Sequence, residues 1–212
     1  MKITKLYIQN YKQIKCGTFT VNSDINIFVG ENDSGKSTIL EAISILSSGK
    51  LNGYALYKQI KANLFNIEVR NLYKTSLFQY PNVIEPPSII FEAYCDTDDA
   101  TYSGTNNLLV ENCAGIRVVV ELNPEHCSTY KKLLAAGEIY DIPVEFYTVS
   151  FKYFSGDTVA YRFCPIKAVF IDTTRKDYSY VVDRFVSENI ATYLSPQEQI
   201  DLCTAYRKSR NY

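Results

Sequence analysis

The stretch VGENDSGKSTILEAISIL, at residues 29–46, joins a glycine-rich loop to the start of a helical pattern. Residues 30–37 within it match G-x-x-x-x-G-K-[ST], the pattern of loops that cradle nucleotide phosphates. The glycines let the backbone turn tightly and approach a phosphate, and successive N–H groups then form a nest for the anion. The helix that follows adds the positive end of its dipole. The stretch therefore predicts a phosphate-binding loop (P-loop).

The side chains of this loop have separate expected roles. Lys36 is expected to contact the β- and γ-phosphates of ATP, and Thr38 is expected on the α-phosphate side. The hydroxyl of Ser37 is expected to bind Mg²⁺, which prefers hard oxygen ligands. A chance glycine-rich turn is the alternative, but an apolar run leads into the loop and an amphipathic pattern leads out of it, as the motif requires. The expected ATP-binding residues of the loop are Gly30, Asn32, Asp33, Ser34, Gly35, Lys36, Ser37 and Thr38, with Ser37 also the metal ligand.

Regular elements are expected on both sides of the loop. The apolar run INIFVG at 25–30 predicts a strand that ends at the loop, and apolar residues spaced three to four apart predict a helix over 37–47. Two shorter strands are expected at 3–9 and 18–21, with a turn near 15–17 between them. Together they predict a compact N-terminal sheet.

Farther along the chain, strands follow one another instead of alternating with helices, as they would in a doubly wound fold. An α+β fold is therefore expected, with a domain over 1–175 and a helical segment over 176–212. Residues 54–80 are ambiguous, with helical character near 54–65. The other expected elements are strands at 88–96, 115–122 and 166–172, a hairpin turn at Ser155-Gly156, a helix over 124–138, and two helices in 176–210 separated at Ser195-Pro196, with Ser195 as an N-cap.

The bulk composition narrows the class of protein. The chain has 212 residues, of which 46% are hydrophobic and 21% charged, as in ordinary globular proteins. Its net charge of −1 gives no overall field that would attract nucleic acid or an anionic membrane. No apolar run approaches the ~20 residues of a membrane span, and the N-terminus does not have the pattern of a signal peptide. Six scattered cysteines without a C-x-x-C pair predict reduced, mostly buried thiols in a cytoplasmic protein.

Two patches of the chain resemble a known family. ITKLYIQNYKQIK at 3–15, followed by INIFVGENDSGKSTILEAI at 25–43, resembles the N-terminus of ATP-binding cassette-type ATPases of the SMC/RecF group. Within that group it is most similar to the OLD (overcoming lysogenization defect) family of ATP-dependent endonucleases, in which an Asn-Phe-(Arg/Lys) stretch precedes the loop. Here that stretch is Asn10-Tyr11-Lys12, with Tyr for the commoner Phe. AVFIDTTRKDYSYV, at 168–181, resembles a later family segment through its Thr174-Arg175 pair.

The resemblance implies the N-terminal lobe of an ABC/SMC-type ATPase, an α/β P-loop NTPase lobe. Such a lobe has an antiparallel-rich mixed sheet around the P-loop helix, followed by C-terminal helices. It also places Lys12 near the adenine or ribose of ATP. Family members bind ATP between two subunits, carry a helical dimerisation insert, and act on DNA through a Toprim nuclease domain. The expected function is therefore ATP binding, with Mg²⁺, in a homodimeric or oligomeric ATPase-nuclease of DNA processing or phage defence.

The parts needed for hydrolysis are not apparent in the sequence. Asp172 is a candidate Walker B carboxylate, but Thr173 follows it where a catalytic Glu would stand. Ser47-Ser48-Gly49 lies too close to the loop for an ABC signature, and the acids of residues 96–99 are better explained as a solvated loop than as a Toprim site. The single histidine, His126, excludes a multi-His metal site. The chain alone is therefore expected to be a fragment that hydrolyses little ATP, with apolar surface that promotes self-association.

Two other functions stay open from the sequence. The chain could be a complete small nucleotide-binding switch or scaffold protein whose catalytic parts come from a partner subunit. It could also be another P-loop NTPase, such as a transporter ATPase or a kinase. The missing signature and the lack of strand–helix alternation argue against this last alternative.

Overall fold

The computed structural model describes residues 1–79, 85–160, 164–168 and 194–209. The chain divides into two compact units, Met1–Ala168 and Val169–Tyr212. None of the helices in the described residues is both long enough and apolar enough to cross a membrane.

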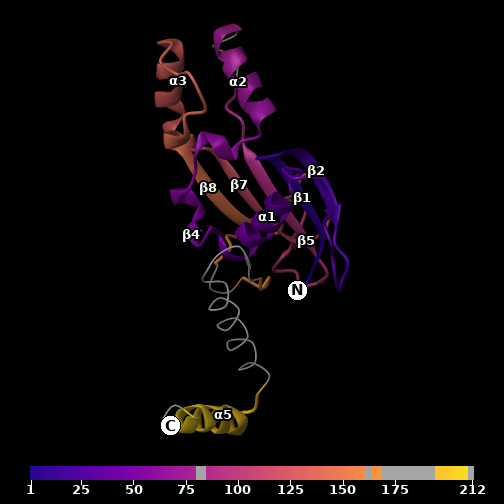
Figure 1. The fold of residues 1–212 in the computed structure, drawn as a ribbon. Coiled ribbons are helices and arrows are strands. Elements are labelled where there is room, and N and C mark those ends of the chain that lie inside the picture. Colours follow the sequence, from indigo (N-terminus) through magenta and orange to yellow (C-terminus); the bar gives the residue numbers. More distant parts are fainter. Residues whose placement is uncertain (80–84, 161–163, 169–193, 210–212) are drawn as a thin grey trace. The chain divides into compact units, whose positions relative to one another are not determined.

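The first unit is built on an antiparallel sheet (Figure 1). Its strands are ordered β2-β1-β5-β7, and β6 and β8 both pair with β7. The strands expected at 3–9, 88–96 and 115–122 are confirmed, with bounds that differ by a few residues. The strands are β1 (Ile3–Tyr11), β2 (Ile14–Thr20), β5 (Ile89–Cys95), β6 (Ser103–Gly104), β7 (Cys113–Leu122) and β8 (Tyr147–Tyr153), and a separate small hairpin is made by β3 (Lys50–Leu51) and β4 (Tyr54–Ala55).

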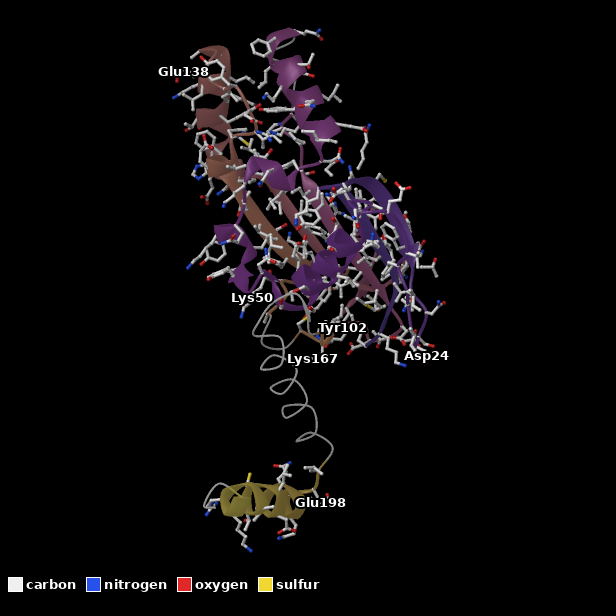
Figure 2. The ribbon with its side chains drawn as sticks, in the orientation of Figure 1. Asp24, Lys50, Tyr102, Glu138, Lys167 and Glu198 are labelled. Atoms are coloured by element: carbon white, nitrogen blue, oxygen red, sulfur yellow. The ribbon has the colours of Figure 1, made fainter. Side chains whose placement is uncertain are left out.

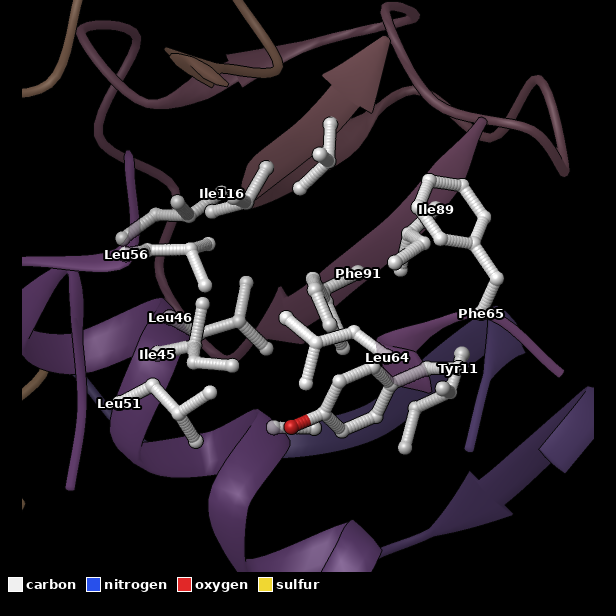
Figure 3. Packing of buried hydrophobic residues seen from close by; sticks show 14 of the residues in the cluster. Tyr11, Ile45, Leu46, Leu51, Leu56, Leu64, Phe65, Ile89, Phe91 and Ile116 are labelled. Atoms are coloured by element: carbon white, nitrogen blue, oxygen red, sulfur yellow. The ribbon is translucent and has the colours of Figure 1, made fainter. Parts of the chain in front are cut away.

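The expected P-loop helix is α1 (Lys36–Ser48), which lies on one face of this sheet. Its buried apolar residues, Ile39, Ala42, Ile45 and Leu46, recur at three- and four-residue spacing, so they form one apolar stripe toward the strands. These residues share one buried cluster with Phe91 of β5, which is fully buried, and Figure 3 shows Ile45 and Leu46 on the α1 side of that cluster. The core therefore fixes the helix, and with it the loop at its N-terminus.

Two helices extend from one end of the sheet, α2 (Ile67–Gln79) and α3 (Cys127–Ala135) (Figure 1). They are joined through a hydrogen bond of 3.0 Å between the hydroxyls of Tyr73 and Tyr130. The helix expected over 124–138 is thus confirmed as a 3₁₀ turn, Pro124–His126, that continues into α3.

Helix α2 corrects the interpretation of residues 54–80. The helical character expected near 54–65 is present only as two short 3₁₀ turns, Leu56–Lys58 and Ala62–Leu64. The long helix begins at Ile67 instead, because the carboxamide of Asn66 accepts from the N–H of Glu68 at 3.1 Å and so caps its first turn.

The strand expected at 25–30 is absent, and this is the main correction to the predicted fold. Ile25, Ile27 and Val29 are 79%, 80% and 89% exposed, while Phe28 packs partly against the core. The run begins beside Asp24, labelled in Figure 2 at the edge of the unit. Its apolar residues alternate as in a strand, but no neighbouring segment among the described residues pairs with its backbone. The described sheet is consequently all antiparallel, not mixed.

Smaller corrections concern the turns. The first hairpin turns at Lys12-Gln13, so residues 15–17, expected as a turn, belong to β2. Ser155-Gly156 does form a turn, and among the residues described up to 160 a single bridge, Lys152 with Thr158, continues the expected hairpin. Of the strand expected at 166–172, residues 166–168 are irregular and the remainder lies outside the described residues.

The second unit is described only over residues 194–209, where α5 (Pro196–Ser209) is its helix. Ser195 caps it as expected, because its hydroxyl bonds the N–H of Glu198 at 3.4 Å. The carboxylate of Glu198 accepts the N–H of Ser195 at 2.8 Å in return, which completes a capping box. The helix expected before Ser195 and the 175/176 boundary lie outside the described residues.

The face of the sheet opposite α1 carries a fully buried carboxylate, that of Glu92 in β5. It accepts the N–H of Leu108 at 3.0 Å and the hydroxyl of Tyr94 at 2.7 Å, and Arg117 lies 3.4 Å away. Burial raises the pKa of Glu92, although these three donors oppose the shift. Its bond to Leu108 links β5 to the connection that precedes β7.

The exposed run at 25–29 leads to a prediction about self-association. Replacing both Ile25 and Ile27 with threonine is expected to lower the self-associated fraction in sedimentation velocity, because it breaks up an exposed aliphatic patch. The thermal midpoint should stay within the range of ordinary surface substitutions, since neither side chain is buried. The matched control is Val110→Thr, because Val110 is 72% exposed and lies outside the run at 25–29. Equal sedimentation of the double variant and the wild type would rule out this patch as the cause of association.

Candidate functional site

The site is built on the loop that precedes α1. Gly35 is the N-cap of α1 with φ 92°, and Asp33 has φ 62°, so both lie in the left-handed region. No side chain hydrogen-bonds the first turn at this cap. The first N–H groups of a helix lack partners within the helix, so here they stay available to an anion.

A cavity of about 530 Å³ lies at this helix terminus. It brings together eight of the nine residues expected to bind ATP, including Lys12 from the β1–β2 turn. Gln13 and Glu41, which the sequence did not indicate, also line it. The lining residues are Lys12, Gln13, Asn32, Asp33, Ser34, Gly35, Lys36, Ser37, Thr38 and Glu41.

Lys36 closes the loop upon itself. Its ammonium donates to the carbonyl of Gly30 at 2.8 Å and to that of Glu31 at 2.5 Å. Gly30, the ninth expected residue, is therefore not in the wall of the cavity but holds Lys36. A Cβ on Gly30 would lie 2.6 Å from the hydroxyl and 3.2 Å from the Cβ of Ser34, so any other residue at this position would require Ser34 to shift. An anion in the cavity would offer Lys36 a stronger, charged acceptor than these carbonyls.

The β1–β2 turn is attached to α1 through Glu41. One carboxylate oxygen of Glu41 accepts the ammonium of Lys12 at 2.6 Å and the hydroxyl of Tyr11 at 2.9 Å. Tyr11 is fully buried, and both burial and the carboxylate of Glu41 raise the pKa of its phenol. These bonds place Lys12 beside the loop, with φ 47° in its own backbone.

A second bond attaches the same turn to the helix. Thr38 is 3% exposed, and its hydroxyl donates to the side-chain oxygen of Gln13 at 2.8 Å. The hydroxyl expected near the α-phosphate is thus already engaged with the turn. Gln13 and Glu41 together explain how a hairpin far from the helix in sequence becomes one wall of the cavity.

Of the two residues that the sequence analysis missed, Glu41 could have been predicted and Gln13 could not. Ser37 and Glu41 are four residues apart on a helix, so they share a face, and Glu41 could have been assigned to the site from Ser37. Gln13 had no such signal, because its place depends on the packing of the hairpin against α1.

A second cavity, of about 420 Å³, adjoins the first and shares Lys12 and Gln13 with it. Its other lining residues come from the segment before α2, namely Asn63 and Phe65, and from the first turn of α2, namely Ile67 and Arg70. Arg70 donates through Nε to Asp141 at 2.9 Å, and this pairing holds the pKa of Asp141 below its usual range. The two cavities together offer a polar end and a more apolar end.

The remaining candidate residues have structural roles in the described part of the chain. Asp96 accepts the N–H of Lys2 at 2.6 Å and Asp99 that of Thr101 at 2.9 Å, as expected of a solvated loop. Ser48 ends α1 at Gly49, and His126 precedes α3. Within the described ranges, no three His, Cys, Asp or Glu side chains gather as a metal cluster. The segment with Asp172, Thr173 and Thr174-Arg175 lies outside those ranges.

The six cysteines are free thiols, as expected, but burial was overpredicted. Only Cys95 and Cys164 are buried, while Cys16 and Cys203 are exposed. Burial raises the pKa of the Cys95 thiol to about 12, which keeps it protonated and unreactive at neutral pH.

The N-terminal part of the chain, which contains the loop, is similar to known proteins. The family model described as an AAA ATPase domain matches residues 1–79. The DNA replication and repair protein RecF of Francisella tularensis subsp. novicida (strain U112) is 42% identical over 50 residues, which is 24% of this chain and 14% of that protein. The same protein of Francisella tularensis subsp. tularensis (strain SCHU S4 / Schu 4) matches to the same extent.

The matched stretch thus spans 14% of the length of these curated relatives. The family match covers the β1–β2 hairpin, the loop, α1 and α2, which are the elements that build both cavities. Together these matches support an SMC/RecF-type P-loop ATPase superfamily for the N-terminal part of the chain.

Proposed function

We propose that residues 1–168 bind ATP with Mg²⁺ as the nucleotide-binding lobe of an SMC/RecF-type ATPase. One observation carries the proposal. Eight residues singled out from the sequence, from the loop and from a separate hairpin turn, line a single cavity at a helix N-terminus without a side-chain cap. The match of residues 1–79 to an ATPase domain supports it.

The donors of the cavity suit a triphosphate and its cation. Lys36 and the N–H groups at the start of α1 would hold the phosphates, as in other helix N-terminal anion sites. Ser37 is exposed in the cavity wall, and its hydroxyl is the kind of hard oxygen ligand that Mg²⁺ takes. A bound Mg²⁺ would neutralise part of the phosphate charge.

The adjoining cavity would take the nucleoside. Phe65 and Ile67 give it apolar contacts for a base, and Asn63 gives it an amide that can both donate and accept. Lys12 and Gln13 lie between the two cavities, which agrees with a place for Lys12 near the adenine or ribose.

Hydrolysis would be completed by groups beyond this site. A Walker B carboxylate and a residue that positions water are needed, and the candidate Asp172 stays a proposal. At the level of the whole protein, we propose a cytoplasmic, dimeric ATPase-nuclease of the OLD type that acts on DNA in DNA processing or phage defence. The alternative is a nucleotide-binding switch or scaffold completed by a partner subunit, which would bind ATP at the same loop.

The proposal is tested by isothermal titration of the chain with ATP-γ-S and with AMP, both with Mg²⁺. We expect ATP-γ-S to bind and AMP to bind at least about tenfold more weakly, since AMP lacks the phosphates that the loop would hold. Equal affinity for the two nucleotides would contradict a site centred on the β- and γ-phosphates.

A second test concerns the metal ligand. Ser37→Ala is expected to weaken binding of ATP-γ-S about tenfold in Mg²⁺ and to leave binding in EDTA unchanged, because only the cation loses a ligand. Ser44→Ala, on the same helix but away from the cavity lining, is the control. A Ser37 variant that loses affinity equally in both buffers would show that the hydroxyl does not act through the metal.

A further inference from the structure

The formal side-chain charges that line the cavity cancel, although its expected ligand is strongly anionic. Two ammonium groups line it, Lys12 and Lys36, and two carboxylates, Asp33 and Glu41. Lys12 is already paired with Glu41 at 2.6 Å. Attraction for phosphate therefore falls to Lys36 and the backbone N–H groups, and it is opposed by Asp33.

Asp33 has no structural task that requires its charge. Its carboxylate is exposed and makes no hydrogen bond within the described residues. Its φ of 62° is a conformation in which Asn serves as well as Asp and Gly serves better. A carboxylate in the wall of a phosphate cavity raises the cost of binding an anion, and the loop does not need it in order to fold.

This cost depends on the charge of the ligand. Free nucleotide carries more negative charge than its Mg²⁺ complex, so the same carboxylate repels the free form more strongly. We propose that Asp33 is a specificity residue, which makes the site select nucleotide complexed with a divalent cation over free nucleotide. This inference rests on the proposed binding of ATP at this loop.

The test compares wild type, Asp33→Asn and Glu31→Gln by titration with ATP-γ-S, in Mg²⁺ and in EDTA at low ionic strength. Asp33→Asn keeps the shape and the backbone preference of the residue. We expect it to tighten binding in EDTA by a factor of about 5 to 10 and binding in Mg²⁺ by less than about twofold. Salt should diminish this difference.

Glu31→Gln is the matched control, because it removes one charge from the same loop at a residue that does not line the cavity. An unchanged ratio of the two affinities in Asp33→Asn would overturn the inference. An equal change of this ratio in Glu31→Gln would overturn the inference too, because the net charge of the loop, and not the position of Asp33, would then determine the ratio. Wild type that binds in neither buffer would refute the proposed function and this inference with it, whereas wild type that binds without the expected ratio refutes the inference alone.

Discussion

Replacing Lys36 with alanine is expected to weaken binding of the Mg²⁺ complex of ATP-γ-S by about 100-fold, on the scale of hydrogen bonds to charged groups. In the free protein the ammonium of Lys36 bonds the carbonyls of Gly30 and Glu31. It can turn from these neutral acceptors to phosphate oxygens without leaving the cavity wall. Isothermal titration of wild type and variant measures the loss.

The control for this variant is Lys50→Ala, an exposed lysine just beyond the other end of α1 (Figure 2). It removes the same charge at a position outside both cavities, so affinity should change less than about twofold, as for a screened surface charge. Circular dichroism establishes that both variants fold. If Lys36→Ala bound as tightly as Lys50→Ala, the loop would not be the site of the phosphates.

The second large effect is expected on stability. Phe91→Ala should lower the free energy of unfolding by about 3–5 kcal/mol, the usual range for a truncated core aromatic. Phe91 is fully buried in β5, and its ring lies 4.9 Å from that of Tyr11 in an edge-on contact. Since Tyr11 holds Glu41, the same change should also loosen the turn that carries Lys12. Urea unfolding followed by circular dichroism measures the effect.

Tyr54→Ala provides the comparison, because this aromatic side chain is 66% exposed. Its removal should change stability by no more than about 0.5 kcal/mol. A Phe91 variant that lost less than about 1 kcal/mol would show that the sheet and α1 are not closely packed at this point, in disagreement with Figure 3.

Local pattern was sufficient for the loop, α1 and the central strands. The helix could be predicted because its apolar residues follow one period over thirteen residues, and β5 and β7 because they are long runs of apolar, β-branched and aromatic residues. Ser195 could be assigned as a cap because capping depends on residues three positions apart. In each case the deciding contacts lie within one element or one turn.

The irregular conformation of residues 25–30 could not be predicted, because it depends on contacts outside the segment. Its alternation satisfies every local criterion for a strand, yet a strand also needs a neighbour for its N–H and C=O groups. The described residues provide none, so Ile25, Ile27 and Val29 stay exposed. The start of α2 was missed because Asn66, which caps it, follows two short turns that resemble the beginning of a helix.

In the site, too, local pattern predicted some residues and contacts between distant segments placed the others. Residues of the loop were accessible to sequence analysis because the motif is contiguous, and Lys12 came only from the resemblance to a family. Gln13 and Glu41 owe their place to hydrogen bonds between the first hairpin and α1, over separations of 25 and 29 residues. Contacts of that kind are set by packing of the whole unit.

Amide chemical shifts of the ¹⁵N-labelled chain show directly whether the loop at 30–38 holds the phosphates of ATP. On addition of ATP-γ-S and Mg²⁺, we predict the largest shifts at the amides of Asn32 to Thr38, with smaller ones at Lys12 and Gln13. These residues line the cavity, and the first-turn N–H groups would become donors to phosphate. Binding that left these amides unmoved and shifted others, such as those around Glu92 on the opposite face, would show that the phosphates lie elsewhere.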